Sequence, residues 1–265
     1  LIFVPTHPKA NVALEWMGFE ARDAILEVLD KAIADSKAQV RVVAYDLSEP
    51  DIVSRLEKLG RRLKIIIDDS KEHGEPGSGE TQAATRLAAS AGTVNVKRQH
   101  MLGLQHNKTI VVNGPKVRMV VCGSTNFSWR GFFVQSNNAL IIRGASAVRP
   151  FLAAFEDYWS QSPAKFSATA SARWSDLGLS GIKARVAFSP HGSSNALLKT
   201  IADDIETKTT SCLFFSLAFL YQTPGVIRDA IKNVSEKDEI FVYGISDKKV
   251  DGLEVQKPDG SVSPV

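Results

Sequence analysis

The chain has 265 residues, of which 44% are hydrophobic, and this is enough for one large domain or two smaller ones. Its 32 Lys and Arg residues against 29 Asp and Glu residues leave a net charge of +3, which without a basic run is weak evidence for a nucleic-acid partner. No run of about 18 apolar residues occurs, so we expect no transmembrane helix, and the Cys and His spacing excludes a typical zinc site. Cys122 and Cys212 lie in apolar, strand-like runs and are expected to be buried, reduced thiols.

Helices and strands alternate along the first half of the chain, and this alternation predicts an α/β fold with a parallel sheet. Residues 70–80 are rich in Gly and charged residues and predict a loop. The predicted elements are a strand at 1–4, a helix at 21–36, a strand at 40–47, a helix at 50–59, a strand at 63–69, a helix at 81–90, a short strand at 93–96, a strand at 138–143 and a helix at 147–159.

Between these elements, residues 105–126 read as two strands joined by the turn Asn113-Gly114-Pro115. Residues two apart on a strand share a face, so His106 and Lys108 are expected to point the same way, with Ser124 and Asn126 brought beside them by the returning strand. An imidazole, an ammonium, a hydroxyl and an amide would then converge without a carboxylate. Such a set suits attack on phosphorus by the histidine while donors bind the anionic oxygens. Taken alone, a His near a Lys on a strand is more often a surface feature.

The spacing His106-x-Lys108-x4-Asn113, followed by Gly123-Ser124-x-Asn126, resembles the signature of the phospholipase D superfamily, H-x-K-x4-D and then G-S-x-N. The resemblance implies a phospholipase D-like fold, with two similar α/β/α half-domains and the active site at their interface. It also implies a mechanism with two histidines, one forming a phosphohistidine and the other protonating the leaving oxygen, without cofactor or metal.

Two positions depart from the family pattern. Asn113 stands at the place of the signature aspartate, where Asn suits a turn before Gly. Asn137, in the segment 135–139, stands where related nucleases carry a glutamate that orients the histidine. An Asn carbonyl can accept from the imidazole N–H, but it adds no charge to stabilise an imidazolium.

The pattern of the first half returns after a small, polar stretch. A helix beginning at 195, a strand at 212–220, a helix at 224–233 and a strand at 239–247 repeat the order found from residue 23 to 69, which indicates an internal duplication. We therefore expect a first half-domain at 1–160, a linker at 161–181 and the start of a second half-domain at 182–265.

Only one His-x-Lys motif is present, and the residues after 247 contain no histidine. Either a second motif follows residue 265, giving a monomer, or another subunit supplies the second histidine, giving a homodimer; the half-repeat favours the first. His191, without a Lys two residues on, is expected to be at most an accessory residue.

The sequence therefore predicts a metal-independent phosphodiesterase with His106, Lys108, Ser124, Asn126 and Asn137 in its site. We expect a nuclease-like enzyme, with DNA or RNA favoured over phospholipid, because the motif spacing resembles bacterial endonucleases of the superfamily. The alternatives are a phospholipase D or phosphatidyl transferase acting on lipids, and a catalytically silent module that binds phosphate or nucleic acid. A cytoplasmic location is expected, although the sequence begins with Leu rather than Met, so N-terminal processing stays open.

Two groups of residues on either side of the motif can each be interpreted in more than one way. Lys97, Arg98 and His100 precede the motif and either line the mouth of an anion site or are solvated. The aromatic segment 127–133 is expected to pack against the sheet, with base stacking and contact with a lipid interface as alternatives.

Overall fold

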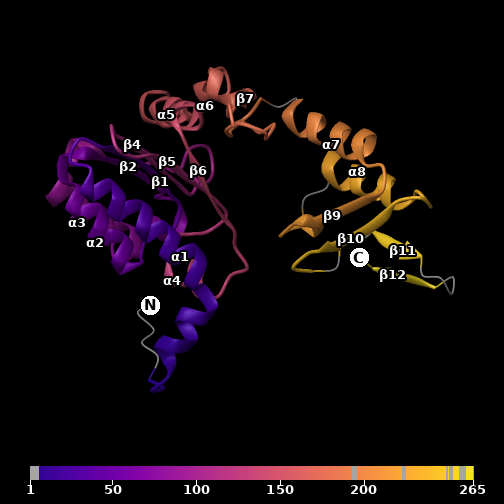
Figure 1. The fold of residues 1–265 in the computed structure, drawn as a ribbon, viewed down its shortest axis with the longest axis horizontal. Coiled ribbons are helices and arrows are strands. Elements are labelled where there is room, and N and C mark those ends of the chain that lie inside the picture. Colours follow the sequence, from indigo (N-terminus) through magenta and orange to yellow (C-terminus); the bar gives the residue numbers. More distant parts are fainter. Residues whose placement is uncertain are drawn as a thin grey trace. The chain divides into compact units, whose positions relative to one another are not determined.

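A computed structural model of the chain describes residues 6–192, 196–222, 225–248, 250, 253–256 and 261–264 (Figure 1). The chain forms two compact units, and the boundary between them falls between Pro190 and His191. The predicted strand at 1–4 lies outside the described residues. None of the helices in these ranges combines the length and apolar character needed to cross a bilayer.

The first unit contains a six-stranded sheet with helices on both faces (Figure 1). Short 3-10 helices connect several elements, one of them at Lys71–Gly74. The elements are α1 (Ala10–Ala34), β1 (Gln39–Ala44), α2 (Pro50–Leu59), β2 (Leu63–Ile67), α3 (Gly79–Ala91), β3 (Val96–Arg98), β4 (Thr109–Asn113), β5 (Arg118–Gly123), α4 (Trp129–Phe133), β6 (Ala139–Arg143), α5 (Ala145–Ser160), α6 (Pro163–Phe166), β7 (Ser175–Asp176) and β8 (Arg185–Val186).

The sheet has the strand order β3-β2-β1-β4-β5-β6 and is mixed. The strands β3, β2 and β1 are parallel, whereas β4 pairs antiparallel with both β1 and β5, and β6 is antiparallel to β5. The parallel arrangement predicted from the alternation of helices and strands is confirmed for β1, β2 and β3, whereas β4, β5 and β6 pair only antiparallel. The predicted Asn113-Gly114-Pro115 turn joins β4 and β5 as a hairpin, and a hairpin joins only antiparallel strands.

Each face of the sheet has its own hydrophobic core. Alternate residues of β1 and β2, such as Val42 and Ile65, pack under α1, α2 and α3. The intervening residues, Val43 and Ile66, pack under α5 on the other face. The predicted α/β/α arrangement is confirmed for this unit, and Figure 1 shows its helices on opposite sides of the sheet.

Helix α2 matches its predicted range because the sequence marks both of its ends. Glu49 caps the first turn by accepting the N–H groups of Asp51 and Ile52, and Pro50 occupies the first helical position. Gly60 follows the last turn with a φ of 55°. Helix α1 instead begins at Ala10, well before the predicted start at residue 21.

The segment 161–181, predicted to be a linker, belongs to the core of the first unit. Phe166, Ala172 and Leu177 are buried in the cluster under α5. Phe188 joins the same cluster, and the Tyr158 hydroxyl donates to the carbonyl of Ser189. The segment after α5 thus packs against the apolar face of this helix, although the segment has little regular secondary structure.

The second unit repeats the order helix, strand, helix, strand of the first. Strands β9 and β10 are parallel, as β1 and β2 are, and the core under α8 includes Leu220 and Ile231. Cys212 in β9 is exposed and Cys122 in β5 is half-buried, so the prediction of burial is wrong for Cys212. The elements are α7 (Ala196–Lys208), β9 (Cys212–Ser216), α8 (Val226–Ser235), β10 (Phe241–Ile245), β11 (Glu254–Gln256) and β12 (Val262–Pro264).

Candidate active site

His106 and Lys108 lie in a segment without regular secondary structure just before β4, not on the strand as predicted. Both side chains nevertheless meet on one ring, that of Tyr45, which follows β1. The His106 ring lies 4.5 Å from the centroid of Tyr45, and Lys108 Nζ lies 4.7 Å from that centroid. The predicted convergence of the imidazole and the ammonium is therefore present.

Lys108 is a buried cation. Its Nζ donates to the backbone carbonyl of His106 at 2.6 Å, which ties the lysine to the segment that carries the histidine. Burial lowers the pKa of Lys108 to about 8, although the carboxylates of Asp46 and Asp68 oppose this shift. Near neutral pH the ammonium is retained, but only a small rise in pH removes it.

The His106 ring is favoured in its neutral form. Its pKa is lowered from the ordinary value of 6.5, first by desolvation and then by the positive charge of Lys108. Asp46 and Asp68 act in the opposite direction, and His73 adds to the lowering. A neutral imidazole presents a nitrogen lone pair, which a nucleophile requires.

Contrary to the prediction, carboxylates stand close to this pair, and the sequence did not reveal them. Asp68 is completely buried just after β2. It accepts hydrogen bonds from the N–H and hydroxyl of Ser70, from His73 Nδ1 at 2.9 Å and from the N–H of Gln105 at 2.6 Å. Burial alone would raise the pKa of Asp68, but these hydrogen bonds outweigh it and lower the pKa.

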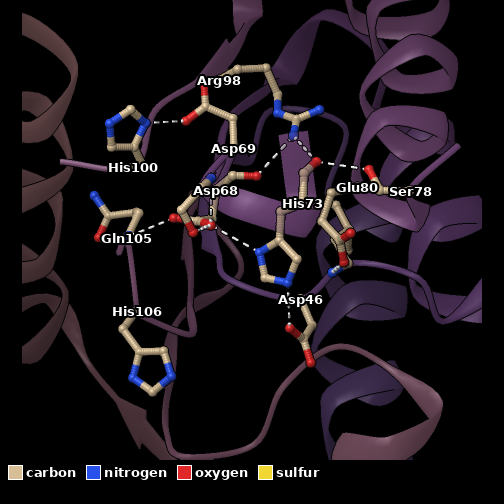
Figure 2. A network of polar contacts seen from close by, with 12 residues as sticks. Asp46, Asp68, Asp69, His73, Ser78, Glu80, Arg98, His100, Gln105 and His106 are labelled. Atoms are coloured by element: carbon tan, nitrogen blue, oxygen red, sulfur yellow. Dashed lines mark hydrogen bonds and ion pairs between the residues drawn. The ribbon is translucent and has the colours of Figure 1, made fainter. Parts of the chain in front are cut away.

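His73 connects Asp68 to Asp46 (Figure 2). Its Nδ1 faces Asp68 Oδ2, and its Nε2 lies 3.2 Å from Asp46 Oδ1. Its ring also packs on Tyr45, with centroids 4.4 Å apart, so His73 and His106 share one aromatic neighbour. Asp46 and Asp68 follow the carboxyl ends of the parallel strands β1 and β2, where the sites of α/β proteins gather, and this position is the signal that could have identified them.

Asp46, His73 and Glu80 are the described residues that could hold a metal ion. Each presents one potential ligand atom, and these atoms lie within 4.8 Å of one another. Each group also has a hydrogen-bond partner in the protein. Ser128 Oγ donates to Asp46, Asp68 pairs with His73, and the N–H of Leu47 donates to Glu80.

The segment from Gly123 to Asn126 is held against β6. The N–H groups of Ser124 and Thr125 both donate to the carbonyl of Asn138, and Ser124 Oγ accepts the N–H of Asn138 at 3.0 Å. Gly123 makes this possible, because it has a φ of +142° and a Cβ there would lie 2.4 Å from the Asn138 carbonyl oxygen. The Ser124 hydroxyl, predicted to lie beside His106 and Lys108, thus contacts the residue that precedes β6.

We expect Gly123→Ala to destabilise the first unit. Backbone strain at positive φ alone costs about 1–3 kcal/mol, and the clash with Asn138 adds to it. Urea unfolding measures the loss. Gly92→Ala is the matched control, because Gly92 has a φ of +93° but nothing within 4 Å of an added Cβ. Equal losses for the two variants would show that the contact with β6 is unimportant.

Asn126 and Asn137 meet at Gln135 rather than at His106. The Nδ2 atoms of both asparagines lie 3.2 Å from Gln135 Oε1, and Asn137 Nδ2 also donates to the carbonyl of Gly131 at 2.9 Å. Asn126 is buried, and its Oδ1 has no partner. Over the described ranges no hydrogen bond joins Asn137 to His106, so Asn137 stays only a predicted partner of that ring.

The basic residues before the motif all have partners within the protein. Lys97 Nζ donates to the carbonyls of Tyr158 and Trp159, and Arg98 donates to the carbonyls of Asp68 and His73. His100 pairs with Asp69, with 2.8 Å between Nδ1 and Oδ1. Arg98 therefore holds the backbone at Asp68 and His73, and these contacts do not indicate a role in binding an anion.

The aromatic segment packs largely as predicted. Phe127 and Phe132 are buried in the core under α1, and Phe133 packs against that core. The carbonyl of Phe127 accepts the N–H groups of Ser48 and Glu49, which ties this segment to the chain after β1.

A small pocket of about 190 Å³ opens beside the motif. His106, Lys108 and Gly123 line it, together with apolar side chains that include Phe151 and Phe188. The end of β5 and the segment before β4 therefore share one cavity, as the predicted hairpin requires.

Comparisons with known proteins show what this chain is similar to. The family model described as "Cardiolipin synthase, PLD-like domain" matches residues 29–159. Among solved structures, polyphosphate kinase from Porphyromonas gingivalis is 12% identical, with a TM-score of 0.54 over 84% of this chain and 36% of the kinase, which shows a shared fold alone. A search of curated proteins finds no match.

Two smaller structures match about half of this chain and most of their own length. NucT from Helicobacter pylori is 17% identical over 52% of this chain and 89% of its own, with a TM-score of 0.40. Nuc from Salmonella typhimurium, described as a phospholipase D family member, is 30% identical over 52% of this chain and 88% of its own, with a TM-score of 0.43. Because this identity extends over most of Nuc and the family model for a PLD-like domain matches residues 29–159, the chain belongs to the phospholipase D superfamily.

Proposed function

We propose that this protein is a phosphodiesterase that hydrolyses its substrate through a phosphohistidine on His106 and needs no metal ion. Membership of the superfamily suggests phosphodiesterase activity in general. The observation that carries the finer proposal is the neutral His106 ring beside the Lys108 ammonium, both against Tyr45. A lone pair and a positive charge side by side suit attack on an anionic phosphodiester.

In the proposed reaction, a ring nitrogen of His106 attacks phosphorus and the bond to the leaving oxygen breaks. The leaving oxygen takes a proton from an acid, which in the family mechanism is a second histidine. Water then attacks the phosphohistidine, gives up a proton, and releases the phosphate ester together with the free imidazole. We propose that a second His-x-Lys motif or a partner subunit supplies the acid. We propose that Lys108 binds the phosphoryl oxygens, together with the Asn126 N–H that does not face Gln135 and with the Ser124 hydroxyl, which can donate while it accepts from Asn138.

We favour nucleic acid as the substrate because the chain is mildly basic and its motif spacing resembles bacterial endonucleases. The family model, described as that of cardiolipin synthase, supports a lipid phosphodiester as the alternative. Cleavage of single- and double-stranded DNA and RNA, compared with release of headgroup from phosphatidylcholine vesicles, separates the two. Binding of either without turnover would instead favour the silent module.

Turnover of a fluorogenic phosphodiester is expected to be unchanged in EDTA. His106 provides the nucleophile and Lys108 provides the positive charge, so the proposed chemistry requires no Lewis acid. The full-length protein is assayed before and after dialysis against EDTA, with a metal-dependent phosphodiesterase as the control for complete chelation. If chelation abolishes turnover and a divalent ion restores it, the proposed mechanism is wrong.

A further inference from the structure

A buried carboxylate connects the end of β2 to the catalytic segment. Asp68 is 0% exposed, and its Oδ1 accepts the backbone N–H of Gln105 at 2.6 Å. Gln105 is itself 1% exposed and directly precedes His106. A charge-assisted hydrogen bond therefore holds the backbone one residue before the proposed nucleophile.

The carboxylate is fixed from several sides (Figure 2). Ser70 and His73 Nδ1 donate to Asp68 Oδ2, and His73 Nε2 reaches on to Asp46. Arg98 Nη2 donates to the backbone carbonyls of Asp68 and His73 at 2.9 and 2.6 Å. The Asp68 carboxylate therefore has little freedom to move. Its hydrogen bond to the Gln105 N–H restricts the position of the Gln105 backbone in turn.

Asp68 also determines part of the charge around the proposed nucleophile. The groups that act on His106 are Lys108 on its own segment, Asp46 after β1, Asp68 after β2 and His73 from the 3-10 helix. The negative charge of Asp68 raises the pKa of His106 and of Lys108, against the lowering by desolvation. Removing the charge should lower both pKa values further.

We propose that Asp68 is a positioning residue of the active site, which fixes His106 through the Gln105 N–H and supplies a buried negative charge facing His106 and Lys108. This inference rests on the proposed function of His106. Asp68 does not touch the reacting atoms, and its effect passes through the backbone and through the local field.

Asp68→Asn tests the proposal, because Asn keeps the size but removes the charge and one acceptor atom. We expect kcat to fall about a hundredfold, as for a misplacement of roughly 1 Å, while KM changes much less. We also expect the titration of His106, followed by NMR of its ring protons, to move to lower pH. A residue that only stabilises the fold would not shift this titration.

Two carboxylates serve as matched controls. Asp69 is the next residue but pairs with the exposed His100, so Asp69→Asn should leave kcat and the His106 titration unchanged. Asp35 is buried like Asp68 and accepts the N–H groups of Lys37 and Lys116, away from the site. Asp35→Asn should reduce the stability of the fold without shifting the His106 titration.

A kcat within about threefold of wild type in a folded Asp68→Asn variant, well short of the hundredfold expected, would overturn the proposal. An unchanged His106 titration would do the same. If the variant does not fold, amide hydrogen exchange in the wild-type protein decides. A strongly protected Gln105 N–H supports the contact with Asp68, and rapid exchange overturns it. Both NMR measurements are independent of turnover, so they remain informative if the proposed phosphodiesterase activity is absent.

Discussion

Replacement of His106 with alanine is expected to abolish turnover of a simple phosphodiester, with a loss of several kcal/mol of transition-state stabilisation. The covalent route disappears with the ring, because the other imidazole on Tyr45, that of His73, has both ring nitrogens against carboxylates, those of Asp68 and Asp46. Steady-state kinetics of the full-length protein measure the effect. A variant that keeps more than about a tenth of the rate has lost less than about 1.4 kcal/mol, and His106 would then not be the nucleophile.

His100→Ala is the matched control for this experiment. His100 is also a surface histidine near the motif, but it pairs with Asp69 and makes no contact with Tyr45 among the described contacts. Its removal should leave turnover unchanged. Rapid quenching at alkaline pH, followed by mass spectrometry, should detect a phosphorylated peptide containing His106 in the wild-type protein and none in His106→Ala.

Replacement of Lys108 with glutamine is expected to lower kcat by about a hundredfold to a thousandfold, the cost of removing one donor to a developing anion. The wild-type pH profile should be bell-shaped. His106 must be neutral, so activity rises with pH through its lowered pKa, below 6.5. Lys108 must be charged, so activity falls as pH rises through its pKa of about 8. The profile of kcat/KM measures both limbs.

Lys97→Gln is the control for the lysine experiment. Burial lowers the pKa of Lys97 as well, but its Nζ is held by the carbonyls of Tyr158 and Trp159. The Lys97→Gln variant should therefore keep the fall in activity near pH 8. In the Lys108→Gln variant, the residual activity should no longer fall near pH 8. A limb that survives in Lys108→Gln would assign that titration to another group.

Elements with their own start and stop signals could be predicted from the sequence. Helix α2 and the hairpin of β4 and β5 depend on Pro50, Gly60 and the Asn113-Gly114-Pro115 turn, which act within a few residues. The extent of the first unit could not be predicted in this way. The segment 161–181 is small and polar, and Phe166 is buried only because α5 presents an apolar surface to it.

The sequence by itself determined the pair His106 and Lys108, because a motif of fixed spacing needs no knowledge of the fold. Only the tertiary structure decided which carboxylates face that pair. Asp46 and Asp68 belong to different strand ends, and the sheet order places β1 between β2 and β4. The carboxyl ends of β1 and β2 therefore lie beside the segment that enters β4, since parallel strands end at one edge of a sheet. His73 lies in the segment 70–80, whose composition predicted only a loop. Its two ring nitrogens contact the carboxylates of Asp68 and Asp46, and these contacts place it in the site.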